Sequence, residues 1–220
     1  MTVSQALRAR HSVRAFTPER PAADLVQSLL EQAGLAASGG NMQPWNVIAL
    51  AGEPLQQAIV AVQTGTPDET PATISYPPGL WEPYRSRRFQ NGEELYQSIG
   101  IPRENKTARL EQVAKNTEFF GAPVGIFVHT DVRMVAAQWI DLGIYLQSFM
   151  LLATEQGLAT CAQGFWRRYQ EPLKQALALP DTQQVAFGIA LGYADPQAPI
   201  NQWRSTRAPW AEWGQLRGFD

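Results

Sequence analysis

The sequence predicts one α+β domain that is interrupted by a long irregular segment. Its 220 residues suit one large domain or two small ones, and no internal repeat divides the chain. Apolar residues make up 45% of it and charged residues 17%, which is an ordinary globular mixture. Apolar residues recur with helical spacing in some segments and form short strand-like runs in others, and the two kinds alternate along the chain.

The N-terminal part predicts two helices, a loop, a strand and a third helix. Leu25, Leu29 and Ala33 lie on one face of the second helix, which follows two prolines. Ser, Gly, Asn and Pro concentrate in the loop after it. In chain order these elements are expected at residues 3–9, near 22–36, 38–44, 45–50 and 55–62.

Residues 64–103 differ from the rest of the chain because they combine six prolines with aromatic side chains. A long irregular segment in a compact domain is usually a lid, a binding loop or a linker. A linker gains nothing from aromatic residues, so we expect a mobile insertion that takes part in binding.

The C-terminal part continues the alternation of helix and strand. Trp139, Leu146 and Phe149 give the longest helix a broad apolar face, which predicts burial on more than one side, in a domain core or a dimer seam. The expected elements are helices near 104–119, 134–155 and 170–178 and strands at 124–128, 159–161 and 184–191.

Charge and residue counts exclude several classes of protein. The formal net charge of −2 opposes bulk attraction to nucleic acid or anionic membranes. One cysteine, Cys161, excludes an intrachain disulfide, and with His11 and His129 as the only histidines we expect no metal site. The first residues contain no apolar signal segment, and no stretch of about 18 apolar residues occurs, so we expect a cytoplasmic protein.

The spacing of the glycines excludes common catalytic motifs. No two glycines lie two residues apart, so the dinucleotide fingerprint is absent, and no Gly-Lys-Ser/Thr phosphate loop occurs. The glycine pairs Gly121/Gly125 and Gly188/Gly192 enclose Pro123 and Ala190 instead of a serine, which disfavours a serine hydrolase. Histidine is also scarce, so we expect catalysis to depend on a borrowed reactive group.

Three groups of arginines are candidate anion sites. A guanidinium donates two parallel hydrogen bonds to a phosphate, so arginines from both ends of the chain could converge on one phosphate. The alternative is that each group is a solvated basic turn. The groups are Arg8, Arg10 and Arg14, then Arg85, Arg87 and Arg88, and finally Arg204 and Arg207.

Four motifs resemble the signatures of the nitroreductase family, in the family's order, with Ala37 where the family has proline. The match runs from about residue 6 to about residue 215, is loosest in the insertion, and is nearest to the nitrobenzoate-reductase-like branch. The motifs lie at residues 10–14 (Arg-His-Ser-Val-Arg), 38–45 (Ser-Gly-Gly-Asn-Met-Gln-Pro-Trp), 157–165 (Gly-Leu-Ala-Thr-Cys-Ala-Gln-Gly-Phe) and 192–196 (Gly-Tyr-Ala-Asp-Pro), the last followed by Arg204 and Arg207.

The resemblance implies a central mixed β-sheet flanked by helices, in an intertwined homodimer with FMN at the subunit interface. It implies that Arg10 and Arg207 hold the FMN phosphate, with Arg204 beside them. Ser38 and Asn41 would come from the other subunit, with Gln43 close by. Ser38 and Asn41 also suit a helix end, so their alternative role is to terminate the preceding helix.

Other residues would contact the flavin ring and the ribityl chain. The resemblance places His11 and Ser12 along the ribityl chain and the pyrimidine ring, although His11 could also belong to a capped turn. Arg14 would face the N1/O2 edge, where a positive charge stabilises the reduced flavin. The backbone at Gln163 and Gly164 would reach the N5/O4 edge, and the family often has Glu at the position of Gln163.

The implied activity is an FMN-dependent oxidoreductase with a ping-pong mechanism. NAD(P)H gives a hydride to flavin N5 and leaves, and a nitroaromatic or quinone acceptor takes its place. The sequence does not indicate which nicotinamide is preferred. Alternatives are a dehalogenase, a flavin destructase or a ring dehydrogenase of the same fold, a non-catalytic flavin-binding protein and, more remotely, a nucleic-acid-binding module.

The insertion is expected to shape the choice of substrate. Its aromatic side chains could form a wall for an aromatic substrate, and Arg85 or Arg88 could pair with a carboxylate. The alternative is a surface lid or a dimer arm with solvated arginines. The candidate substrate residues are Trp81, Tyr84, Arg85, Arg88 and Phe89, with Tyr96 as a further member of the wall.

Overall fold

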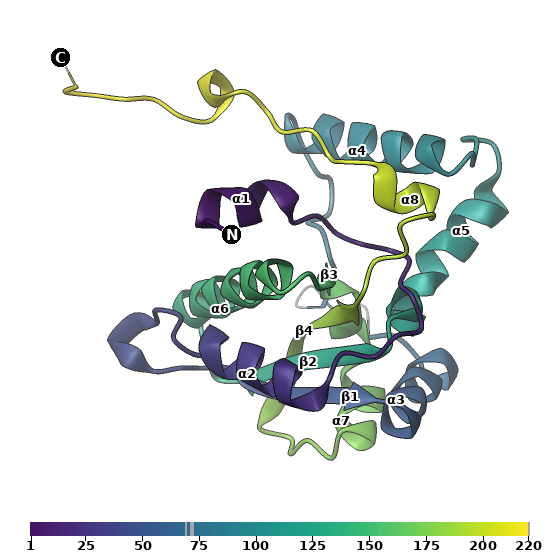
Figure 1. Ribbon diagram of the computed structural model, residues 1–220, viewed down its shortest axis with the longest axis vertical. Helices are drawn as coiled ribbons and strands as arrows, with labels where there is room; N and C mark the ends of the chain where they lie inside the picture. The colour runs from purple at the N-terminus through teal and green to yellow at the C-terminus, as the bar shows by residue number, and fades with distance from the viewer. Residues whose placement is uncertain (69, 71–72, 220) are drawn as a thin grey trace.

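Four strands form one sheet between two layers of helices (Figure 1), in a computed structural model that describes residues 1–68, 70 and 73–219. The sheet has the order β1-β2-β4-β3, and all neighbouring strands are antiparallel. The strands are β1 (Asn46–Ala51), β2 (Val124–Asp131), β3 (Ala159–Gln163) and β4 (Gln183–Gly192).

This strand pairing differs from the mixed sheet that the family resemblance implied. Within the described residues, parallel pairing occurs only at an isolated bridge between Ser12 and Thr160. The extended segment around Ser12 lies along the outer edge of β3 and is too short to form a further strand. The sheet of the single chain is therefore antiparallel, with one parallel contact at its edge.

The expected helices are present, and the structure adds two that the sequence did not predict, at residues 84–98 and 199–202. The helix expected over 104–119 ends early, at Ala114, because the next residues form a 3-10 turn, η2 (Lys115–Gly121), in which Phe119 and Phe120 have positive φ values of 49° and 55°. The helices are α1 (Val3–Ala9), α2 (Ala23–Ala33), α3 (Glu53–Thr64), α4 (Tyr84–Ser98), α5 (Lys106–Ala114), α6 (Ala136–Glu155), α7 (Gln170–Ala176) and α8 (Pro199–Gln202).

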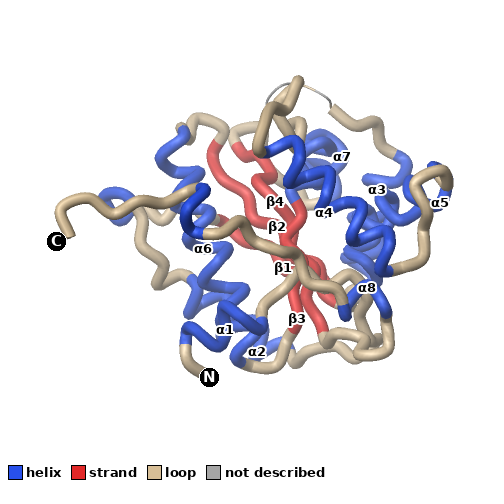
Figure 2. The backbone as a smooth tube through the Cα atoms, turned by 90° about the horizontal axis from the view of Figure 1, so that it is seen from above, coloured by secondary structure: helices blue, strands red, loops and turns tan. Residues whose placement is uncertain are grey.

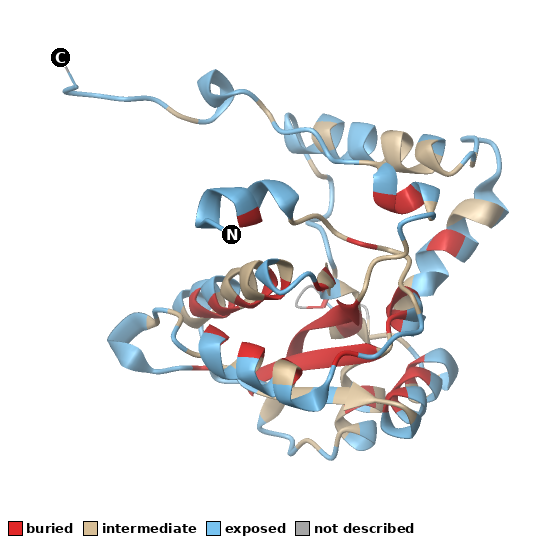
Figure 3. Cartoon of the chain, viewed as in Figure 1, coloured by how far each residue is buried: buried red, intermediate tan, exposed pale blue. Residues whose placement is uncertain are grey.

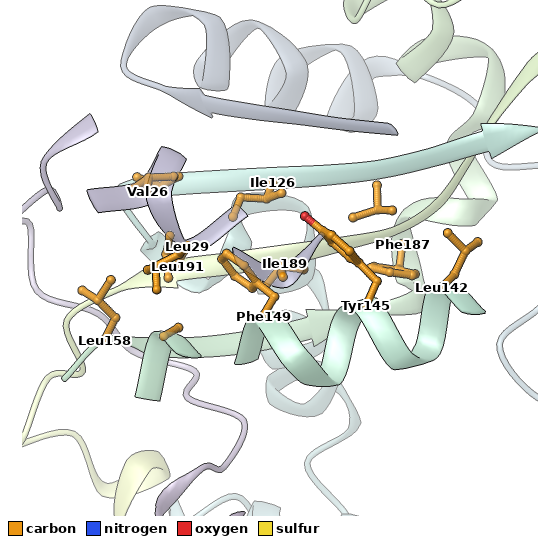
Figure 4. Packing of buried hydrophobic residues seen from close by; sticks show 14 of the residues in the cluster. Val26, Leu29, Ile126, Leu142, Tyr145, Phe149, Leu158, Phe187, Ile189 and Leu191 are labelled. Atoms are coloured by element: carbon orange, nitrogen blue, oxygen red, sulfur yellow. The ribbon is translucent and has the colours of Figure 1, made fainter. Parts of the chain in front are cut away.

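One face of the sheet packs against α2 and α6. Tyr145 and Phe149 project from α6 onto the strand residues Ile189 and Leu191 (Figure 4), and all four side chains are at most 1% exposed. Residues of α2 complete this cluster, which explains the periodic leucines of the second helix. Burying one such side chain contributes about 1.5–3 kcal/mol, so this layer holds α6 firmly against the sheet.

The opposite face packs against α3, α7 and the 3-10 turn η3 (Gly164–Tyr169). Trp166 is fully buried there and stacks on Phe119, with ring centroids 4.2 Å apart. A Cβ atom on Gly188 of β4 would lie 2.3 Å from Cδ1 of Trp166, so the indole needs a glycine at this position. Figure 3 shows buried residues concentrated on the strands and on the helix faces that cover them.

The prediction that residues 64–103 are irregular is wrong for residues 84–98, because these form the 15-residue helix α4. This helix has no buried residue, so it lacks the apolar periodicity that reveals a helix in a sequence. Side-chain pairs such as Gln90 with Glu94 support it locally. Residues 69 and 71–72 of the expected insertion, including Pro71, lie outside the described residues.

Contacts with two other elements position α4. Arg109 of α5 forms two hydrogen bonds to the carboxylate of Glu93, and its guanidinium lies 4.3 Å from the centroid of the Tyr96 ring. Arg87 forms an ion pair with Glu212 in the C-terminal segment at 2.9 Å. These contacts place α4 above the edge of the sheet, beside α8 (Figures 1 and 2).

The C-terminal residues run outward from the body of the chain (Figures 1 and 2). They leave Trp210, Trp213, Leu216 and Phe219 between 51% and 78% exposed. Such exposed apolar residues on an extended arm are typical of a surface that another chain covers. No helix in the described part of the chain is long and apolar enough to cross a membrane.

Candidate functional site

Hydrogen bonds of the Asn201 side chain connect the N-terminal motif to the C-terminal segment. This side chain is buried, and it accepts a hydrogen bond from the backbone N–H of Arg14 at 2.9 Å and donates one to the carbonyl of Ala15 at 2.8 Å. The backbone N–H of Val13 donates to the carbonyl of Thr160 at the edge of β3. The first, third and fourth motifs therefore meet in space, although they lie far apart in the sequence.

This arrangement brings together the arginine cluster, which we define as Arg10, Arg204 and Arg207. Burial, and then the positive charge of Arg207, lowers the pKa of Arg10. Burial is also the main cause of the lowered pKa of His11, with smaller contributions from Arg204 and Arg10. None of the ion pairs in the described part of the chain includes an arginine of this cluster, so the cluster is a concentration of positive charge.

His11 adds an unused polar atom to this region. Its Nδ1 lies 3.2 Å from the carbonyl oxygen of Ala9, but its Nε2 is buried and has no hydrogen-bond partner. A buried polar atom without a partner costs free energy unless a ligand or a water satisfies it. Together with the neighbouring guanidinium groups, this atom suits a ligand that carries a phosphate and further hydrogen-bonding groups.

A cavity of about 840 Å³ lies between β3, α5 and the insertion. We call it the main cavity, and Arg14, Gln163 and Gly164 line it, which brings three predicted cofactor residues into one site. Arg10 interacts electrostatically with Cys161, which also lines this cavity, whereas Arg207 lines a second, outer cavity that shares Tyr76 and Arg88 with it. The main cavity has room for a flat multi-ring ligand such as a flavin.

Gln163 faces the cavity at its backbone, while internal contacts occupy its side chain. The amide nitrogen donates to both oxygens of Asn116, and the amide oxygen accepts from Nε1 of Trp166 at 3.3 Å. The neighbouring Gly164 is exposed, and a Cβ atom there would meet nothing within 4 Å. The side chain of Gln163 is therefore engaged, which leaves the backbone at this position to contact a ligand.

Cys161 is buried, and burial raises the pKa of its thiol. Arg14, Ser12 and Arg10 act in the opposite direction and are smaller influences. This environment fits an unreactive thiol that forms part of the cavity wall, and Ser12 lies against it from the N-terminal motif.

The second motif lies away from the main cavity. Ser38, Asn41 and Gln43 belong to a loop around η1 (Gly39–Asn41), and none of the three lines this cavity. Asn41 and Gln43 are exposed and have positive φ values of 56° and 49°, which non-glycine residues rarely adopt.

Tertiary contacts hold this strained loop in place. Asp141 of α6 is 6% exposed and accepts a hydrogen bond from the backbone N–H of Gly39 at 3.2 Å, and its other carboxylate oxygen is buried without a partner. Thr130 donates to the carbonyl of Pro44 at 2.7 Å. No sequence motif indicated the role of Asp141, because it acts across 102 positions of the chain.

Of the five candidate substrate residues, only Arg88 lines the main cavity. Trp81 and Tyr84 contact one another on the surface, Arg85 pairs with Glu82 at 2.7 Å, and the guanidinium of Arg103 lies over the exposed ring of Phe89. In the single chain, these four candidates do not contribute to the cavity wall.

Other aromatic residues form that wall. The sequence indicated Tyr96, but it missed Tyr76, Phe120 and Phe165. Tyr76 precedes two prolines in a segment without regular structure, and Phe120 lies in a 3-10 turn with a positive φ. No periodic pattern marks such positions.

Comparisons with known proteins agree with this geometry. The family model described as "Nitroreductase family" matches residues 7–193. A 4-nitrobenzoate reductase of Pseudomonas putida is 35% identical over 213 residues, covering 96% of this chain and 93% of that protein. A nitrobenzene nitroreductase of Ectopseudomonas oleovorans is 35% identical over 207 residues, covering 91% and 90%.

Solved structures give the same result. The FMN- and NADPH-dependent nitroreductase NfnB from sphigopyxis sp. strain HMH has a TM-score of 0.94 and 40% identity, with 100% of both chains covered. The FMN-dependent nitroreductase NfnB from Mycobacterium smegmatis, in complex with NADPH, has a TM-score of 0.88 and 28% identity over 98% of this chain and 100% of that one. The chain belongs to the nitroreductase family.

Proposed function

We propose that this protein is an FMN-dependent oxidoreductase that uses NAD(P)H to reduce nitroaromatic or quinone acceptors by a ping-pong mechanism. The observation that carries the proposal is the arginine cluster beside a cavity that contains Arg14 and Gly164. The residues present fit FMN, because guanidinium groups and the unpartnered Nε2 of His11 lie next to a cavity large enough for its ring system.

FMN, when bound, supplies the two-electron chemistry, since it accepts a hydride from the nicotinamide and passes it to the acceptor. Arg10 and Arg207 hold the phosphate, and Arg204 adds positive charge. Arg14 places a positive charge in the cavity, where it favours a reduced, anionic ring. The backbone at Gly164 orients the reactive edge.

The aromatic wall of the main cavity supports the same activity. Tyr96, Phe120 and Phe165 exclude water and offer flat surfaces to a flat substrate. None of the described residues that line the cavity is Asp, Glu or His, and the neutral side chains there that carry a proton on oxygen or sulfur include Tyr76, Tyr96 and Cys161.

The active form in this proposal is a homodimer in the cytoplasm. Ser38, Asn41 and Gln43 lie outside the main cavity of their own chain, so we assign them to the site of the partner. Exposed apolar side chains on α1 and α6, such as Leu7 and Ile140, offer a surface for association. Sedimentation at low micromolar concentration should give twice the chain mass, and a monomer that retains FMN would contradict the assignment.

Asp141→Ala should weaken FMN binding, because it frees the loop that carries Ser38 and Asn41. A hydrogen bond to a charged group contributes about 1.5–3 kcal/mol, so the FMN dissociation constant should rise roughly tenfold. Asp141→Asn keeps an acceptor for the Gly39 N–H and should lose less. Hydrogen exchange at residues 39–43 should accelerate in the alanine variant, and unchanged exchange would remove Asp141 from this role.

The visible spectrum tests the proposed function directly. The purified protein should be yellow or become yellow with added FMN, and NADPH or NADH should bleach it without oxygen. Addition of nitrobenzene should restore the colour. A protein that never binds FMN, or whose bound flavin is not bleached by either nicotinamide, would refute the proposal.

A further inference from the structure

Arg88 differs from the other arginines of α4 because no acidic side chain among the described residues pairs with it. Arg85 pairs with Glu82 at 2.7 Å, and Arg87 pairs with Glu212 at 2.9 Å. The guanidinium of Arg88 lies instead over the ring of Tyr76, 4.3 Å from its centroid. In the part of the chain that the structure describes, no carboxylate forms an ion pair with Arg88, so both of its outward N–H groups can serve a ligand.

Arg88 and Tyr76 stand where two cavities meet. Both residues line the main cavity, and both line an outer cavity of about 870 Å³ between α4 and the C-terminal segment. Stacking on the tyrosine limits the directions in which the guanidinium can point, because cation–π contact favours the face of the ring. The planar fork therefore lies at the border of the two cavities in a restricted orientation.

The main cavity combines a cation with aromatic walls. Tyr96, Phe120 and Phe165 provide flat apolar surfaces. The positively charged residues of the lining are Arg14, Arg88, Arg167 and Arg168. No acidic residue is among the described residues that line it. A low-dielectric cavity with charge of one sign concentrates ligands of the opposite sign.

We propose that Arg88, held on Tyr76, binds the carboxylate of an aromatic acceptor, so that the enzyme selects nitrobenzoates over uncharged nitrobenzenes. The inference rests on the proposed function and deepens it by naming the substrate class. A carboxylate matches the two parallel donors of a guanidinium, and the attached ring then lies along the aromatic wall.

A phosphate of the nicotinamide cofactor is the competing partner for Arg88. The outer cavity would receive it, since Arg87 and Arg207 line that cavity beside Arg88 and the carboxylate of Glu212 is paired with Arg87. The main cavity differs by its aromatic walls, which suit the ring of an aromatic carboxylate. The measurements with NADPH and NADH below distinguish these two partners.

Binding of an unreactive ligand provides the first test. Benzoate and its neutral isostere benzamide are titrated into the oxidised holoenzyme by calorimetry. Arg88→Ala should weaken benzoate binding roughly tenfold and change benzamide binding less than about twofold, since a charge-assisted hydrogen bond is lost only for benzoate. Arg85→Ala is the matched control, because Arg85 lies three residues away on the same helix, outside both cavities.

Reoxidation of the reduced enzyme provides the second test. In stopped-flow measurements, Arg88→Ala should lower the second-order rate constant with 4-nitrobenzoate but not with nitrobenzene, and Arg88→Lys should recover part of the loss by restoring the charge. Equal losses with both acceptors, or an equal effect of Arg85→Ala, would overturn the inference.

A third result would also overturn the inference. If Arg88→Ala raised the KM for NADPH while leaving NADH and 4-nitrobenzoate unaffected, Arg88 would be a phosphate contact. A failure of the proposed function itself would look different from a failure of this inference, because the wild-type protein would then reduce neither 4-nitrobenzoate nor nitrobenzene.

Discussion

Arg10→Ala is expected to abolish retention of FMN during purification. The guanidinium can form two charge-assisted hydrogen bonds to a phosphate, each contributing about 1.5–3 kcal/mol, so the dissociation constant should rise at least about a hundredfold. Equilibrium dialysis or fluorescence titration of the apoprotein measures this constant. Arg8→Ala is the control, because Arg8 is an exposed residue in the last turn of α1.

The stability of the apoprotein separates this role from a merely structural one. Arg10 is held close to Arg207, and both burial and this like charge lower its pKa. Its removal relieves that repulsion, so the melting temperature of the apoprotein should stay the same or rise while FMN affinity falls. A large drop in apoprotein stability with unchanged FMN affinity would show that Arg10 is structural.

Trp166→Ala is expected to cause a large loss of stability. Trp166 is fully buried, stacks on Phe119 and meets Phe127 edge to face, with centroids 5.2 Å apart. Truncation of a buried Trp costs about 3–5 kcal/mol, which lowers the melting temperature of a chain this long by roughly 6–20 °C. Trp166→Phe keeps a ring and should lose clearly less.

Gly188 supplies an independent check on the same packing. A Cβ atom at this position would lie 2.3 Å from Trp166, so Gly188→Ala should cost about 1–3 kcal/mol by overpacking. In the Trp166→Ala background the obstructing indole is gone, and the same substitution should cost much less. Denaturant unfolding of the four proteins in this cycle measures the coupling, and strict additivity would contradict the predicted contact.

Local patterns predicted most of the elements correctly. Short apolar runs predicted β2 and β4, which are buried on both faces, and the leucine spacing predicted α2. Helix α4 escaped prediction because helical periodicity becomes visible only when one face is buried, and α4 buries none of its residues. The positive φ values of Phe119 and Phe120, which end the long helix expected there, depend on core packing.

The sequence by itself determined the family and the residue types of the site, because short motifs keep their order along the chain whatever their distance in space. Only the tertiary structure decided which of them meet. Asn201 joins segments 187 positions apart, and Arg88 lies over Tyr76 and lines the main cavity while Arg85 pairs with Glu82 outside it. Such convergence depends on hydrogen bonds and ring contacts between distant segments. These contacts produce no periodic pattern of residues in a single sequence.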